Sequence, residues 1–365
     1  MATLNTIFPL SSKDAYSQND IVDYILTFED KQIVRNSIRI SGKVAVTKIS
    51  DKTAFVDGSK AVYYDSIAGI SGAFQSITCS CDEVGVVENQ NEYPRYVRTK
   101  ANATMTSDQM CSESDKTLEL KLGGLDVKAS TALIIGDGSG VDFSMKPDVA
   151  FNKSSANLPF NKTGVMKLSL RLSTNTQFLY GDDSATFQYQ LSDLQLHYNT
   201  VPGYKVDGPI SMETIHHVKT NAESNNTSIS TRVPAVVQSA SIVFHEESKL
   251  NSAKFNHLKS MIPPDIERVE FTMNDTMSNY TTYTLDTVQD IIYNYQQSWG
   301  VPPMSKSNLD NVHIREYKDA YGIGMPFGSM IDMSNNKFGV SILSSIVSTQ
   351  KYGVFMFFRG VTSLK

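Results

Sequence analysis

The stretch Tyr189–Pro202 (YQLSDLQLHYNTVP) is the part of the sequence that decides the fold. Its apolar positions are Leu191, Leu194, Leu196 and Tyr198, and from position 194 onward they alternate with polar residues. Such a period of two predicts a strand with one buried face. The strand runs into a Val-Pro-Gly sequence near the middle of the 365-residue chain, which predicts the end of a structural unit at that point.

A weak internal repeat links this region to the C-terminal part of the chain. Segment 164–174 (GVMKLSLRLST) precedes 177–181 (QFLYG), and segment 339–349 (GVSILSSIVST) precedes 354–360 (VFMFFRG). Each copy predicts a strand, a Ser-Thr turn, an aromatic strand and a glycine, and the copies are 175 residues apart. We interpret this as one β-sandwich used twice, which favours a scaffold over a catalyst.

The bulk composition agrees with a protein rich in strands and polar loops. A chain of 365 residues exceeds the usual size of a single core, so two domains are expected. The hydrophobic fraction of 40% is enough to build cores, while the charged fraction of 19% is low. The net charge of −5 and the pI of about 5.7 argue against a general nucleic-acid binder.

The cysteines and the N-terminus exclude further classes. Three cysteines, Cys79, Cys81 and Cys111, argue against a disulfide framework. Cys79 and Cys81 are expected on one face of a strand, without the partners that a metal site needs. The N-terminal residues lack the basic and apolar segments of a signal peptide, and no segment has the length and hydrophobicity of a transmembrane helix.

The sequence pattern predicts a series of short strands. Two are expected within residues 21–47, with Gly42 at a bulge, and one at 118–122 (LELKL). Leu168, Leu170 and Leu172 alternate with polar residues, so Leu170 is expected to face the core and Arg171 the solvent.

Few helices are expected, and several segments are predicted to be loops. The spacing predicts helices over Lys249–Met261 and Leu285–Trp299, with Thr284 as the N-cap of the second. Residues 81–115 and 219–231 are polar and predicted to be loops. Fold class is therefore predicted as all-β, with sandwiches or barrels and a few short helices.

The motifs that could carry chemistry are weak. Gly136–Gly140 (GDGSG) follows an apolar run, but its spacing is not that of a phosphate loop and no helix follows, so a turn is expected. The six histidines, which are His197, His216, His217, His245, His257 and His313, show no metal-ligand spacing. Neighbouring His216 and His217 would point to opposite faces of a strand. We predict no catalytic, cofactor-binding or metal-binding residues.

Two aromatic segments allow structural and functional interpretations. Tyr352, Phe355, Phe357, Phe358 and Arg359 form a nearly continuous run, which predicts a strand buried on both faces; packing against a neighbouring subunit is also possible, since subunit contacts are enriched in aromatics. The helix over Leu285–Trp299 carries Tyr293, Tyr295 and the only tryptophan. It either covers a sandwich or presents a face to a partner.

The whole pattern resembles the major capsid proteins built from two jelly rolls, a lineage that includes membrane-containing tailless phages, the adenovirus hexon and virophage coat proteins. The resemblance rests on the mid-chain strand Leu191–Tyr198, the linker at Val201–Gly203 and the aromatic strand Val354–Arg359. An opening of the form Ile7–Leu10 followed by Ile38–Val46 also looks like the start of such a roll. It covers nearly the whole chain.

The resemblance implies a tandem jelly roll with an arm at 1–18, a first roll at 19–200 and a second roll at 201–365. It implies a virion protein, made in the host cytoplasm, that forms a homotrimer of pseudo-hexameric outline and tiles an icosahedral shell without an active site. Neighbouring capsomers, minor capsid or penton proteins and an internal membrane are its implied partners, with no specific nucleic acid. The arm would be free to reach neighbouring capsomers or the particle interior.

Other functions stay open at this point. A minor capsid or penton protein usually has a single roll, which the repeat argues against. A receptor-binding fibre protein usually has a Gly-rich or heptad shaft, which the sequence lacks. A carbohydrate-binding sandwich needs a row of exposed aromatics, which Tyr63–Tyr64, Tyr93–Tyr96 and Tyr280–Tyr283 could supply.

Overall fold

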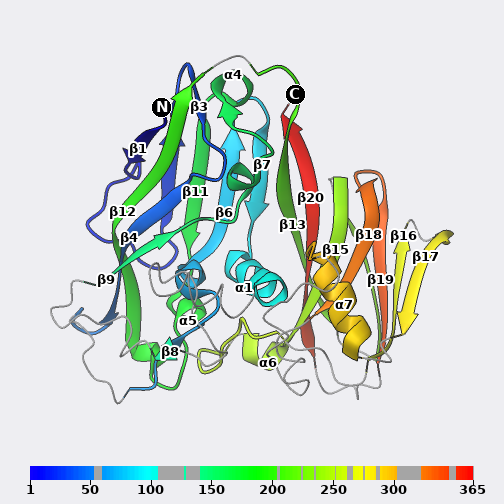
Figure 1. The fold of residues 1–365 in the computed structure, drawn as a ribbon. Helices are drawn as coiled ribbons and strands as arrows, with labels where there is room; N and C mark the ends of the chain where they lie inside the picture. The colour runs from blue at the N-terminus through cyan, green and yellow to red at the C-terminus, as the bar shows by residue number, and fades with distance from the viewer. Residues whose placement is uncertain are drawn as a thin grey trace.

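The structure is a computed structural model, and its β-strands form two sandwiches side by side (Figure 1). It describes residues 1–52, 60–105, 127–128, 140–203, 206–222, 225–233, 236–250, 252–260, 266–273, 276–284, 288–301, 322–344 and 351–364. Several predicted features lie outside these residues: the strand at 118–122, most of the 136–140 loop, Cys111, His313 and the start of the helix predicted from Leu285.

The first sandwich consists of a six-stranded and a four-stranded sheet. In the larger sheet the order is β10-β3-β12-β4-β9, and β1 pairs with the free side of β12; in the smaller sheet it is β2-β11-β6-β7. The strands are β1 (Thr3–Ile7), β2 (Ile21–Leu26), β3 (Lys31–Ile33), β4 (Arg39–Lys48), β6 (Phe74–Cys81), β7 (Gly85–Gln90), β9 (Val141–Met145), β10 (Leu158–Pro159), β11 (Met166–Leu172) and β12 (Phe187–Pro202). A separate pair joins β5 (Tyr63–Tyr64) to β8 (Val127–Lys128).

The second sandwich consists of two four-stranded sheets, in the orders β13-β20-β15-β18 and β14-β19-β16-β17. All the ladders are antiparallel. The strands are β13 (Ile210–Ala222), β14 (Asn226–Arg232), β15 (Val236–Glu246), β16 (Ile266–Met273), β17 (Thr276–Thr284), β18 (Ile323–Asp332), β19 (Lys337–Ser344) and β20 (Tyr352–Leu364).

Both sandwiches have the same strand order. In the second, the first strand of the roll pairs with the eighth, the eighth with the third and the third with the sixth; the other sheet joins the second, seventh, fourth and fifth. In the first sandwich, β1, β12, β4 and β9 are the first, eighth, third and sixth strands of the roll. Strands β2, β11, β6 and β7 are its second, seventh, fourth and fifth strands. This double Greek key is the jelly roll, so the tandem jelly-roll fold predicted from the sequence is confirmed. The boundary at residues 200 and 201 stays a prediction, and it lies close to the end of β12.

In the part of the chain that the structure describes, the helices are few and short, as predicted, and one of the two predicted positions is confirmed. They are α1 (Tyr93–Thr104), α4 (Phe160–Thr163), α5 (Asn175–Phe178), α6 (Glu247–Leu250), α7 (Val288–Ser298) and the 3-10 turns η1 (Gly69–Ala73), η2 (Ala150–Lys153) and η3 (Ser184–Thr186). Helix α7 confirms the prediction at 285–299. The helix predicted over Lys249–Met261 is wrong, because helix α6 is a single turn and residues 252–260 form turns.

Two segments predicted to be loops are ordered elements. Residues 219–231 belong largely to β13 and β14, which pair along their lengths with β20 and β19. Their polar composition reflects half-exposed strands rather than a loop. Residues 81–115 contain β7 and α1, and α1 lies between the two rolls (Figure 1).

A bulge in β12 explains the phase change seen in its sequence. Leu191 and Leu194 are both buried although three positions apart, and the register with β4 shifts between Ser192 and Gln195. Asp193 takes a positive φ of 51° there. Gly42 lies opposite, and a Cβ at this position would lie 2.8 Å from Cδ2 of Leu194. The bulge near Gly42 is therefore confirmed, with the extra residue in the partner strand.

The N-terminal segment is not a free arm. Residues Thr3–Ile7 form β1, which pairs antiparallel with β12. Thr3 lies opposite Thr200 at one end of the ladder, and Ile7 lies opposite Leu196 at the other. Tyr16 is buried, bridges to Leu191 and donates its hydroxyl to the carbonyl of Ser11. The prediction that residues 2–17 reach freely toward neighbours is thus wrong for this segment, because its strand completes the first sheet.

The internal repeat is half correct. Its first parts correspond to β11 and β19, which are the seventh strands of the two rolls. Its second parts do not correspond, because residues 177–181 contain the end of α5 and a turn, whereas 354–360 belong to the eighth strand β20. The true counterpart of β20 is β12.

The buried apolar side chains of both rolls form one continuous cluster, and β11 shows the predicted register. Leu168, Leu170 and Leu172 are buried while Arg171 is exposed. The run Tyr352–Phe358 is buried throughout, so the prediction of a strand buried on both faces is confirmed. Among the described residues, no helix combines the length and hydrophobicity required to cross a membrane.

Candidate functional site

Among the described residues, a network of buried polar side chains lies at the junction between the two rolls. The first roll contributes β7, α1 and η2, and the second contributes β13, β15 and β20 (Figure 1). Ser154 and Met212 form a β-bridge across it. The backbone N–H of Ser155 donates to the carbonyl of Ser211 at 2.8 Å. The junction therefore begins as backbone pairing between the rolls, which fixes their relative position.

Glu88 of β7 is the central side chain of this junction. Its carboxylate accepts hydrogen bonds from the backbone N–H of Ala150 at 2.7 Å and that of Ile215 at 2.7 Å, and from the side-chain amide of Gln90 at 2.8 Å. Ala150 belongs to the first roll and Ile215 to the second. Burial raises the pKa of Glu88, although Lys153 and these three donors oppose that rise. One carboxylate thus satisfies buried donors of both rolls.

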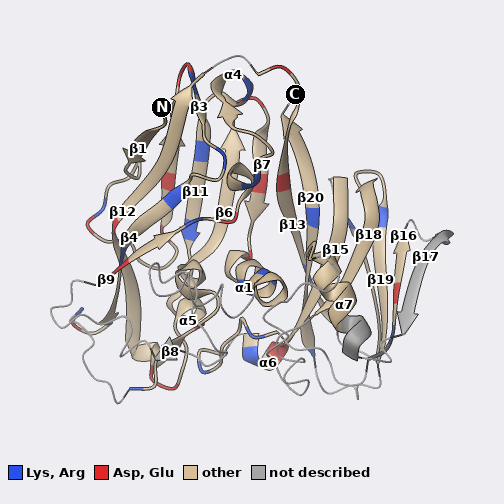
Figure 2. Cartoon of the chain, in the orientation of Figure 1, with Lys and Arg blue, Asp and Glu red and all other residues tan. Residues whose placement is uncertain are grey.

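Lys153 links three carboxylates at the same place. Its Nζ lies 3.5 Å from Asp148, 3.8 Å from Glu213 and 3.9 Å from Glu88. Figure 2 shows the acidic segments of β7 and β13 side by side, an arrangement that needs a cation between them. Burial would lower the pKa of Lys153, but the three carboxylates raise it above its ordinary value. The lysine is therefore held in its charged form.

Asp148 is stabilised as an anion by a second lysine. Lys100 Nζ lies 2.6 Å from its Oδ2, and the hydroxyl of Tyr96 donates to the same oxygen at 3.0 Å. Burial would raise the pKa of Asp148, but Lys100, Lys153 and Tyr96 together lower it well below its usual range. The same environment, led by burial, raises the pKa of Tyr96. Helix α1 is thereby anchored to η2.

Arg95 of α1 reaches into the second roll. Its guanidinium lies over the ring of Phe355 at 4.0 Å, and Nη1 donates to the carbonyl of His257 at 2.8 Å. The same atom lies 2.7 Å from Nε2 of His245. A neutral imidazole accepts such a bond, whereas a protonated one would oppose it. Burial, followed by Arg95, accordingly lowers the pKa of His245.

His257 responds to the same cation. Burial lowers the pKa of His257 to about 3; Arg95 contributes to this shift and Asp65 opposes it. Both histidines are therefore neutral at physiological pH. This makes the contact between α1 and the second roll sensitive to acid, because protonation would place a second positive charge beside a buried guanidinium.

A second ion pair lies next along helix α1. Nη1 of Arg98 lies 2.5 Å from Oδ2 of Asp65, and both side chains are at most 5% exposed. The amide of Asn256, from the second roll, donates to the same oxygen at 2.6 Å. The other oxygen accepts from the N–H groups of Ile67 and Ala68. Both oxygens of the buried Asp65 carboxylate are satisfied in this way, as the burial of a charge requires.

Aromatic side chains fill the remaining space between the rolls. The ring of Tyr96 lies 5.9 Å from that of Trp299 and 6.0 Å from that of Phe357. Trp299 also contacts Tyr295 of α7 edge-on at 6.4 Å. Such pairs add to the free energy gained by burying their apolar area. The predicted covering role of helix α7 is confirmed for Tyr295 and Trp299, which are buried, whereas Tyr293 is exposed.

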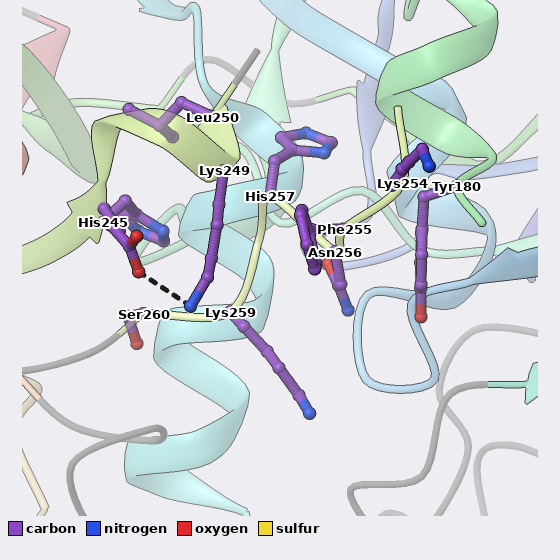
Figure 3. A pocket seen from close by; sticks show the side chains of 11 residues that line it. Tyr180, His245, Lys249, Leu250, Lys254, Phe255, Asn256, His257, Lys259 and Ser260 are labelled. Atoms are coloured by element: carbon purple, nitrogen blue, oxygen red, sulfur yellow. Dashed lines mark ion pairs between the residues drawn. The ribbon is translucent and has the colours of Figure 1, made fainter. Parts of the chain in front are cut away.

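A cavity of about 350 Å³ opens beside this junction (Figure 3). Lysines 249, 254 and 259 surround it, with His245 and His257 among the lining residues. Nζ of Lys249 lies 2.7 Å from Glu246, and Nζ of Lys254 lies 3.4 Å from Asp182. Because two of the three lysines are paired with carboxylates, the cavity is only weakly basic.

The histidines and cysteines weighed in the sequence are dispersed. Among the described residues no group of three His, Cys, Asp or Glu side chains could hold a metal ion. Cys79 and Cys81 are buried on one face of β6 as expected. His216 lies beside Thr214 on one face of β13, and His217 stacks against Phe355 on the other. His197 bonds Thr6 and Ser41 on the outer face of its sheet.

Those tyrosines considered for carbohydrate binding whose side chains the structure describes do not form an exposed row. Tyr64, Tyr93 and Tyr96 are at most 2% exposed. Tyr63 stacks on Tyr180 at 6.0 Å between ring centroids. The side chains of Tyr280 and Tyr283 lie outside the described residues. The described tyrosines therefore serve packing.

Sequence reasoning missed the junction residues Glu88, Arg95 and Lys153. The signal for α1 was present, because Pro94 occupies its first turn and Tyr93, Tyr96 and Ala101 share a buried face. No local signal distinguishes Glu88 from an exposed glutamate.

Comparison with known proteins gives a clear structural match and no sequence match. No protein-family model matches the chain, and no curated protein matches it. Many solved structures are similar to the chain, and three of them illustrate the match. PBCV-1 VP54, fitted into a reconstruction of the virophage Sputnik, has a TM-score of 0.64 at 10% identity and covers 100% of this chain and 95% of that one. The Faustovirus major capsid protein has a TM-score of 0.62 at 8% identity, with coverage of 100% and 90%.

The mavirus major capsid protein has a TM-score of 0.53 at 12% identity, covering 99% of this chain and 88% of that one. These likenesses, together with the strand order of both rolls, define the fold. It is the tandem jelly roll of the major capsid proteins of icosahedral viruses, as the resemblance in the sequence implied.

Proposed function

We propose that this chain is a viral major capsid protein whose homotrimer forms a pseudo-hexameric capsomer of an icosahedral shell. The observation that carries the proposal is the pair of jelly rolls with identical strand order, locked together in one chain. The match to the Faustovirus and mavirus major capsid proteins, over 90% and 88% of their chains, supports it.

The geometry suits a ring of three chains. Each chain supplies two similar sandwiches side by side, so three chains supply six around a threefold axis. A head-to-tail contact between such units closes into a ring when the rotation fits. The buried charges at the junction favour one fixed arrangement of the two rolls, as a tiling unit requires.

The role is structural rather than catalytic. The buried ionisable groups of the junction bind one another and the backbone, and they face across the interface between rolls. Neighbouring capsomers are the first partners expected, followed by minor capsid or penton proteins and an internal membrane. The protein is made in the host cytoplasm and resides in the virion, and its acidic composition gives no basis for specific nucleic-acid binding.

The solution mass of the purified protein tests this proposal. The monomer has a mass of 40.4 kDa, and a closed trimer would have a mass of roughly 121 kDa by light scattering on a sizing column. We expect the trimer or larger shells, and electron microscopy should then show pseudo-hexagonal particles. A monomer at all accessible concentrations would contradict the proposal.

A further inference from the structure

Five exposed apolar side chains are carried by the edge strands β1 and β2 of the first roll and by the residues that follow β1. Leu4, Phe8, Leu10, Ile21 and Ile25 are each between 37% and 66% exposed. Leu4 belongs to β1, and Phe8 and Leu10 follow this strand directly. The N–H of Leu10 donates to the carbonyl of Asp23 at 2.9 Å, which places this segment against β2. We call these five residues the edge patch.

The edge patch is unusual for a free sheet edge. Strands β1 and β2 are the outer strands of their two sheets, and exposed edges commonly carry charges that discourage association. Here Ile21 and Ile25 flank the single charge of Asp23 on β2. That carboxylate is already paired with Lys167 at 2.9 Å and accepts from Ser169 at 2.5 Å. Covering the patch would therefore leave no unpaired charge behind.

The strand order indicates what covers this surface. Strand β1 is the first strand of the first roll, as β13 is of the second. Within the chain, β13 contacts β7 of the other roll and bonds Glu88 through Ile215. The same position on the first roll is occupied by β1, and Figure 1 shows it at the flank opposite the second roll.

We propose that the edge patch is the contact surface for a second copy of this chain, which presents the outer strands β17 and β18 of its second roll. This inference rests on the proposed function and identifies the surface that closes the ring. β17 and β18 end the two sheets of the second roll, and Met330 of β18 is 59% exposed. Each chain then has one edge patch on its first roll and one pair of outer strands, β17 and β18, on its second roll. The edge patch of one chain contacts the outer strands of the next, so the contact is heterologous and closes after three copies.

A pair of matched double variants tests the inference in the full chain. Phe8→Asp with Ile21→Asp places two charges in the edge patch, and Phe255→Asp with Ile49→Asp makes the same changes at exposed positions elsewhere. All four side chains are about half exposed or more, so both variants should fold, which circular dichroism and thermal unfolding would check. Leu4→Lys provides a second, independent change in the patch.

The measurement is the solution mass as a function of concentration. We expect the edge-patch variants to raise the concentration at which the trimer dissociates about tenfold or more, and the control variant to leave it unchanged. If the wild type is a trimer and the patch variants are equally stable trimers, the inference is overturned while the proposed function stands. Equal weakening by the control also overturns it, and a monomeric wild type overturns both.

Discussion

The substitution Glu88→Gln should weaken the junction between the rolls without changing its shape. Both carboxylate oxygens of Glu88 accept a backbone hydrogen bond. Oε2 accepts from the N–H of Ala150 and Oε1 from the N–H of Ile215, each at 2.7 Å. Glutamine has almost the same shape but offers only one acceptor oxygen. Its NH₂ group would face either Ala150 or Ile215, and one buried N–H would lose its partner.

The expected loss follows from two contributions. An unpaired buried donor destabilises by about 1–3 kcal/mol. Removing one partner of a buried ion pair destabilises by about 3–5 kcal/mol when the other charge is left alone. Lys153 keeps Asp148 at 3.5 Å and Glu213 at 3.8 Å, so the second contribution is much smaller here. We expect a total of about 2–4 kcal/mol, or roughly 3–5 °C in Tm for a chain of 365 residues.

Denaturant and thermal unfolding at pH 8 would measure this effect, since Glu88 is most fully ionised at alkaline pH. Glu83→Gln in the same hairpin is the matched control, because Glu83 is exposed and the change should remain within about 0.5 kcal/mol. A Glu88→Gln protein as stable as the control would refute the argument that this carboxylate holds the rolls together. Because burial raises the pKa of Glu88, the folded state takes up a proton there at a higher pH than the unfolded state, so acidification should not reduce the difference between the wild type and Glu88→Gln.

Three other changes give distinct outcomes. Burial lowers the pKa of His257 to about 3 from an unfolded value of about 6.5, so the unfolded state binds more protons below pH 6.5. The free energy of unfolding should therefore fall between pH 6.5 and 5, by at most about 1.4 kcal/mol per pH unit for this group. His257→Gln should flatten this pH profile, measured by urea unfolding. Leu170→Asp should prevent soluble expression by burying a carboxylate, at a loss of several kcal/mol, whereas Arg171→Asp should be mild; equal damage would refute the register of β11. Gly42→Ala should destabilise by about 1–3 kcal/mol in thermal unfolding, because its Cβ would meet Leu194; an unchanged Tm would mean that the bulge yields.

The strands that bury one face were predictable because their patterns are local. Strand β11 alternates from Met166 to Leu172, and β12 does so on both sides of Asp193. The phase change between Leu191 and Leu194 was visible in the sequence and marks the bulge opposite Gly42. The aromatic run of β20 was predictable for a different reason, since a strand covered on both faces loses its polar positions.

Elements governed by distant partners were not predictable. Lys249–Met261 has helical spacing, yet its carbonyl groups accept hydrogen bonds from distant residues instead of from a helix. Arg95 donates to the carbonyl of His257, and the N–H of Gly181 donates to the carbonyl of Ala253. Strand β14 is polar because its side chains are mostly exposed, and it is a strand because β19 pairs with it. In both cases tertiary contacts override the local pattern.

The junction was the least predictable part, since its residues are ordinary in sequence. Glu88, Lys153 and Glu213 lie far apart in the chain. They form ion pairs only because the fold brings β7, η2 and β13 together. The edge patch shows the opposite case. Its apolar residues lie within the first 25 positions, but the sequence places Leu4, Phe8 and Leu10 in a free arm and Ile21 and Ile25 in a separate strand, and only the pairing of β1 with β12 shows that the arm belongs to the sheet.

The two rolls share a strand order but differ in how their equivalent sheets are covered. The outer face of the sheet β13-β20-β15-β18 is apolar at Phe355 and Phe357, because α1 of the first roll covers it. The equivalent sheet of the first roll has a polar outer face with residues such as His197, which bonds Thr6 and Ser41 within the sheet. Only the second roll needs an apolar face to receive its neighbour within the chain. The proposed contact between chains would use only the narrower edge beside β1 and β2, where the five residues of the edge patch are exposed.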